Sequence, residues 1–170
     1  MGFFDYFMGQ EQDKVKKYSE LYDVLAYEFP DLNEKELILA SCLAGLLARV
    51  AYVDFKLDPK EMTKILEVLK MWDISDKLDP VVAGKMAMAH IKNMAGLDNH
   101  LYVHPLKEHL SENERYKVLQ SLFLVAASDG NVAIVESEEI RLITKGLELS
   151  NQHFISAQAE VVEFINALKK

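Results

Sequence analysis

Cysteine, proline and tryptophan are scarce in this 170-residue chain, which has one, four and one of them. With Cys42 as the only cysteine, no disulfide can form within the chain, which suits a reducing compartment. The neighbours of Cys42 are apolar, so we expect it to be a small core residue. No stretch alternates apolar and polar residues over a useful length, so we expect no β-sheet. No linker rich in Pro, Gly or Ser divides the chain, which favours a single domain.

The sequence also lacks the usual marks of catalysis and of polyanion binding. It has no glycine-rich phosphate loop, no nucleophile elbow and no Ser/His/Asp cluster, so we do not expect an enzyme. Lys and Arg number 19 against 27 Asp and Glu, a net charge of −8 that disfavours nucleic-acid binding. The longest apolar run, residues 37–53, contains Arg49 and is too short and too polar for a transmembrane segment.

Apolar residues recur at helical spacing through most of the chain. We therefore predict an all-α, single-domain bundle of about seven helices. The apolar run should be its buried centre, because it has no polar face. The predicted helices cover 12–28, 34–53, 59–72, 79–95, 112–128, 136–148 and 150 to the end, and Pro105 is expected to interrupt an irregular segment or short helix over 97–110.

The N-terminal segment, residues 1–10, is rich in aromatic residues, and the helical domain is predicted to span 11–170. The segment lacks the basic leader and the length of a signal peptide. We expect it to pack back onto the domain, with a weak membrane or partner contact as the alternative.

One phrase occurs twice, about 75 residues apart. In both copies an apolar helical run ends at an aspartate, a glutamate follows seven positions later, and a new amphipathic helix begins. We call residues 54–61 the first elbow and residues 129–136 the second elbow. The duplication predicts an internal pseudo-two-fold repeat, with the helices over 34–53 and 112–128 as a central antiparallel pair.

The acidic residues of the elbows do not form an EF-hand. Counting from Asp54, position 6 is Pro59 where the calcium loop needs Gly, and counting from Asp129, position 12 is Ile140 where it needs Glu. Two interpretations remain open. Either the aspartates form Asx turns and the glutamates are ordinary first-turn residues, or the carboxylates converge on Ca²⁺, Mg²⁺ or Mn²⁺, which prefer oxygen ligands. The candidate metal ligands are Asp54, Asp58, Glu61, Asp129, Glu136 and Glu139.

Three segments of the chain resemble the TerB-like family, helical bacterial proteins named for tellurite resistance. The opening Met-Gly-Phe-Phe-Asp is similar to that family's start. The first elbow, from Ala48-Arg49-Val50-Ala51-Tyr52-Val53-Asp54 through Glu61, is similar to its motif A-x-x-D-G … E. The strongest likeness is Val125-Ala126-Ala127-Ser128-Asp129-Gly130-Asn131-Val132 through Glu136 to Ile143, then Leu147-Glu148-Leu149-Ser150 and Phe154.

The resemblance implies a bundle of about seven helices and a cytoplasmic protein of the tellurite or general stress response. It also implies protein partners, among them membrane-associated tellurite-resistance proteins, with a peripheral position at the inner membrane as an open alternative. By motif position, the metal-binding acids suggested for the family would be Asp54, Glu61, Asp129 and Glu136. Phe55 stands where the family motif has Gly, so we expect the first elbow to differ in shape from the second.

The sequence thus predicts a binding or scaffold module that responds to divalent cations through its acidic elbows. The alternative is a metal-independent structural adaptor that binds a protein partner through an apolar or acidic surface.

Overall fold

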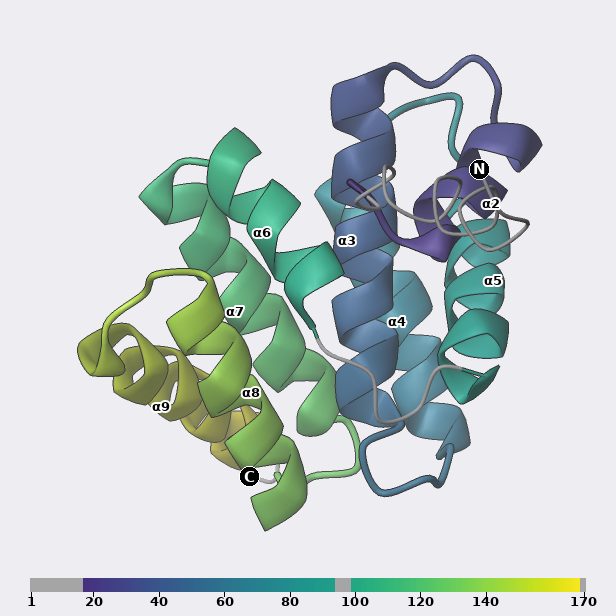
Figure 1. Ribbon diagram of the computed structural model, residues 1–170. Coiled ribbons are helices and arrows are strands. Elements are labelled where there is room, and N and C mark those ends of the chain that lie inside the picture. The colour runs from purple at the N-terminus through teal and green to yellow at the C-terminus, as the bar shows by residue number, and fades with distance from the viewer. Residues whose placement is uncertain (1–16, 94–98, 169–170) are drawn as a thin grey trace, which may run out of the picture.

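The computed structural model describes residues 17–93 and 99–168. Every regular element in these residues is an α-helix, so the predicted all-α class is confirmed (Figure 1). Eight helices lie in the described part, close to the predicted seven: α2 Glu20–Glu28, α3 Glu34–Ala51, α4 Pro59–Trp72, α5 Pro80–Asn93, α6 His100–His109, α7 Glu112–Ala126, α8 Ile134–Gly146 and α9 Asn151–Leu168.

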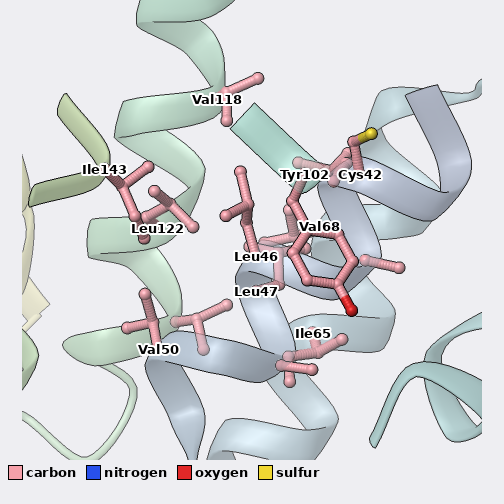
Figure 2. Packing of buried hydrophobic residues seen from close by; sticks show 14 of the residues in the cluster. Cys42, Leu46, Leu47, Val50, Ile65, Val68, Tyr102, Val118, Leu122 and Ile143 are labelled. Carbon is pink, nitrogen blue, oxygen red and sulfur yellow. The ribbon is translucent and has the colours of Figure 1, made fainter. Parts of the chain in front are cut away.

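Helix α3 runs through the middle of the bundle and contacts α2, α4, α5, α6, α7 and α8. Of its 18 residues 13 are buried, as its lack of a polar face predicts. Its small residues permit close approach: a Cβ added to Gly45 would lie 2.5 Å from the Tyr102 ring of α6. Leu46 and Leu47 point into the core among side chains from neighbouring helices (Figure 2).

Helix α7 is the counterpart of α3 in the second copy, and the two pack against each other. Phe123 of α7 is fully buried and meets Phe154 of α9 edge to face, with 5.3 Å between ring centroids. Contacts also cross between the copies, α4 to α7 and α3 to α8. The two helix pairs α3–α4 and α7–α8 therefore form a single core. The predicted antiparallel arrangement of α3 and α7 is wrong, because both helices run in the same general direction and end at the same side of the bundle, where the chain enters the two elbows (Figure 1).

Helix α2 begins later than its apolar spacing predicts. The Ser19 hydroxyl accepts the backbone N–H of Tyr22 at 3.2 Å and caps the helix, so helical structure starts at Glu20. Residues 12–16 of the predicted helix lie outside the described residues. The predicted boundary between segments 1–10 and 11–170 also falls there and stays a prediction.

Helix α6 corrects the prediction for 97–110, because Pro105 lies inside a continuous helix instead of interrupting it. Proline has no N–H for the carbonyl four residues earlier, which belongs to Leu101. The thiol of Cys42 lies 3.9 Å from that oxygen and is its weak donor. Cys42 is buried as predicted, and burial raises the pKa of its thiol to about 12.

In the described residues, no helix combines the length and the apolar character needed to cross a membrane.

Candidate functional site

Each elbow turns immediately after its aspartate. Asp54 Oδ1 accepts the N–H of Lys56 at 3.0 Å, and Asp129 Oδ1 accepts the N–H of Asn131 at 3.1 Å. Both are Asx turns, in which a carboxylate replaces a backbone carbonyl and reverses the chain. This prediction is confirmed, and it leaves the second oxygen of each carboxylate outside the turn.

The residue after each aspartate has a positive φ, 62° at Phe55 and 94° at Gly130. The expected difference in shape between the elbows is therefore wrong. The same Asx turn imposes the same left-handed backbone, and Phe55 adopts it at a cost of about 1–2 kcal/mol. Its side chain is 65% exposed and meets the Tyr52 ring edge to face at 6.0 Å.

The two elbow glutamates occupy equivalent positions in the first turns of α4 and α8. Glu61 Oε2 accepts the N–H of Asp58 at 3.2 Å, and Glu136 Oε2 accepts the N–H of Ala133 at 2.7 Å. This backbone bond holds each carboxylate beside its own helix N-terminus. Only 7% of Glu61 and 8% of Glu136 is exposed, so both carboxylates face the interior between the copies.

The two glutamates meet across the repeat. The side chains of Glu61 and Glu136 are hydrogen bonded to each other, which requires a proton on one carboxyl group. Burial, and then the bond to Glu136, raise the pKa of Glu61 to about 8. Burial also raises the pKa of Glu136, and the negative charges of Asp129 and Asp54 add to that rise. The two predicted corners thus form one acidic cluster.

The family model for Tellurite resistance protein TerB matches residues 40–159, which include α4 and α7 and both elbows. This chain belongs to the TerB family. No curated protein and no solved structure matches it. The matched segment contains all six of the predicted acidic residues, so the acidic cluster belongs to the part of the chain that is common to the family.

In the TerB domain Glu139, the sixth predicted acid, lies outside the acidic cluster and pairs with Arg49. Glu139 Oε1 accepts Arg49 Nε at 2.9 Å and Asn99 Nδ2 at 2.6 Å. The side chains of Arg49 and Glu139 are only 17% and 10% exposed, so this ion pair ties α3 to α8 inside the bundle. Arg49 is the one basic residue in the apolar run, a signal that it needs a buried acid. No sequence pattern indicates that this acid is Glu139.

The cluster in the TerB domain has the oxygen-only chemistry that hard cations prefer. Its present geometry is a carboxyl pair joined by a proton, with Asp54 and Asp129 beside it and Asp58 capping α4. Across residues 17–93 and 99–168, no three His, Cys, Asp or Glu side chains are arranged as a ready-made ion cage. A cation at this place would have to displace the shared proton and draw the exposed aspartates inward.

Proposed function

We propose that this TerB-family protein is a cytoplasmic binding module of the tellurite or general stress response, and that divalent cations control it through the elbow cluster. The observation that supports the proposal is the meeting of Glu61 and Glu136, which come from different copies of the repeat. A cation bound by both carboxylates would link the two copies of the repeat in place of the proton that Glu61 and Glu136 share.

Each acid has a distinct role in this proposal. Glu61 and Glu136 would be the central ligands, because they are already in contact and nearly buried. Asp54 and Asp129 are exposed, and one oxygen of each is used by the Asx turn, so the other oxygen would complete the site. Ca²⁺, Mg²⁺ and Mn²⁺ remain the candidate ions, since the ligand type does not separate them.

Thermal unfolding tests the proposal directly. At a cation concentration a hundred times its dissociation constant, the folded state gains about 2.7 kcal/mol. For a chain of this size the melting temperature should rise by about 5–10 °C relative to protein in EDTA. Glu136→Gln keeps the capping bond but loses the charge, and Asp129→Asn keeps the Asx turn, so both should fold and both should lose the cation-dependent rise.

Glu138→Gln is the matched control, because it makes the same chemical change on α8 in a side chain that is 65% exposed. It should keep the full cation response. Melting curves of the wild type that coincide in EDTA and in each of the three cations would refute cation control.

A metal-independent adaptor is the second candidate, and exposed apolar side chains beside the elbows favour it. Ile134 is 82% exposed, Phe55 65% and Val135 49%. Such residues suit contact with a protein partner. Membrane-associated tellurite-resistance proteins are the proposed partners in either case, which would bring the module to the inner membrane. Partner binding that Phe55→Ser and Ile134→Ser weaken equally with and without cation would support the adaptor.

A further inference from the structure

A second feature of the bundle lies away from the acidic cluster. A cavity of about 630 Å³ opens where α7 runs between α4 and α9. We call it the Trp72 groove, after the only tryptophan of the chain. Trp72 lies eleven residues after Glu61, about 16 Å farther along α4, so the groove and the cluster are separate.

The floor of the Trp72 groove is apolar and held in place. Trp72 is partly exposed, and its Nε1 donates to Ser121 Oγ at 2.9 Å, while Ser121 Oγ donates to the carbonyl of Lys117 at 2.8 Å. These two bonds fix the indole against α7. Aliphatic side chains from four helices surround it: Leu39, Val68, Leu124 and Val161. Met71 stands at the edge with 72% of its surface exposed.

The rim of the groove is acidic. Asp73, Glu114 and Glu160 come from the end of α4, from α7 and from α9, against the single base Lys117. The hydrogen bond from the Ser111 backbone lowers the pKa of Glu114, which keeps it charged. Glu160 accepts from Tyr116 Oη at 2.9 Å and from Gln120 Nε2 at 2.5 Å, which position its carboxylate.

An apolar floor with carboxylates on three sides is complementary to one face of a basic amphipathic helix. We propose that the Trp72 groove binds such a helix from a partner protein, with bulky apolar side chains on the floor and Lys or Arg against the rim. An uncharged small ligand would use the floor but leave the three rim acids unmatched. The net charge of −8 adds a general attraction for a basic partner.

The probe is a synthetic helix of about 18 residues, or five turns, with leucine on one face, lysine on the other and no tryptophan. Added to the full-length protein in EDTA, it should shift the Trp72 emission to the blue in a saturable way. A peptide of the same composition with its leucines scrambled around the helix should bind at least tenfold more weakly, because it has no apolar face. Equal binding of both peptides overturns the proposal.

Variants separate the floor from the rim. The double variant Glu114→Gln/Glu160→Gln keeps an acceptor oxygen for the Ser111 N–H and for one of the two donors to Glu160. It should weaken binding about tenfold, since each exposed charge pair accounts for about threefold. Met71→Ala should weaken it about fivefold. Glu28→Gln, an exposed acid on α2 outside the groove, is the charge control and should bind like the wild type. If the double variant binds the peptide with wild-type affinity, the proposal of a basic partner helix is overturned.

Two other occupants of the Trp72 groove, the chain's own N-terminal segment and a second copy of the chain, would give different results. If Phe3→Ser/Phe4→Ser/Phe7→Ser in the full chain moves the Trp72 emission to the red and strengthens peptide binding, the chain's own N-terminal segment fills the groove. If Met71→Ala dissociates a dimer detected by sedimentation, a second copy fills it. Either result overturns the partner helix. All titrations are carried out in EDTA, so failure of the groove proposal leaves the cation proposal standing, and the reverse holds too.

Discussion

The two elbows reach one backbone shape with different residues. The first elbow has a strained Phe55 and a side-chain cap from Asp58, whose Oδ1 accepts the N–H of Lys60 at 2.7 Å. The second elbow has Gly130, which tolerates its φ of 94°, but its cap position is Ala133, which has no side-chain acceptor. What the elbows share is the aspartate of the Asx turn and the glutamate seven positions later, each with the same hydrogen bond to the backbone of its elbow.

The largest expected effect concerns the ion pair between Arg49 of α3 and Glu139 of α8, which joins the two copies of the repeat. Positions equivalent to Arg49 and Glu139 are Leu124 and Lys64, so the ion pair between α3 and α8 has no counterpart. Arg49→Met would leave the nearly buried Glu139 carboxylate without its cation. We expect a loss of about 2–4 kcal/mol in the free energy of unfolding, measured by urea denaturation.

Lys64→Met is the control for this prediction, because Lys64 pairs with Glu67 at the surface of α4 and should contribute under about 1 kcal/mol. Similar losses of unfolding free energy in the two variants would mean that the buried Arg49 pair stabilises the fold no more than the surface Lys64 pair.

The second prediction concerns the proton that joins the elbows. The pKa of Glu61 is about 8 in the folded protein, above the ordinary value of 4.5, so the folded state binds more protons than the unfolded state between these values. This contribution to stability in EDTA should therefore be complete below pH 4.5 and be lost as the pH rises through 8. The measurement is the melting temperature from pH 5.5 to 8.5.

Glu136→Gln sharpens this test. Without the second carboxylate, the pKa of Glu61 should fall and the decline with pH should shrink. A wild-type melting temperature that rises steadily over the same range would contradict the shared proton.

The third prediction concerns the backbone strain of a non-glycine residue at positive φ, which is added to the second elbow or removed from the first. Gly130→Ala introduces a Cβ at positive φ and should cost about 1–2 kcal/mol. Phe55→Gly removes the same strain, but it also frees the unfolded chain and loses the contact with Tyr52, so its net effect should lie within about 0.5 kcal/mol of zero. Both are measured by urea denaturation, and a large gain for Phe55→Gly would show that the Tyr52 contact is negligible.

The smallest expected effect concerns the missing cap. Ala133 has the extended φ and ψ of a cap residue, −66° and 152°. Ala133→Ser should therefore stabilise α8 by about 0.5–1 kcal/mol, and Asp58→Ala should destabilise α4 by about 1 kcal/mol. Thermal unfolding in EDTA measures both. An unchanged Ala133→Ser would mean that the bond from Ala133 N–H to Glu136 already satisfies this helix end.

The sequence was a good guide wherever the cause of a structure was local. The capping patterns at Asn33, Asp58 and Ser111 all formed, and the Asx turns of both elbows follow from a single aspartate in each. The absence of a polar face placed α3 at the centre. Spacing misplaced the start of α2 because the apolar stripe continues past Ser19, and it misjudged α6 because a buried thiol accompanies Pro105.

Features that depend on how helices pack were not predictable from the sequence. The elbows looked like two sites, but the crossing of α3 and α7 brings Glu61 and Glu136 together. The sequence likewise could not show that Glu139 belongs to Arg49, since 90 residues separate them. The Trp72 groove collects residues from four helices that are far apart in the sequence, and these residues form no sequence motif.

The burial of Cys42 has a consequence for the chemistry of stress. Its thiol, with a pKa of about 12, carries almost no thiolate at neutral pH, and the thiolate is the form that attacks oxidants and oxyanions. Since this is the only cysteine, the folded chain offers almost no thiolate to such agents or to mixed disulfides with other proteins.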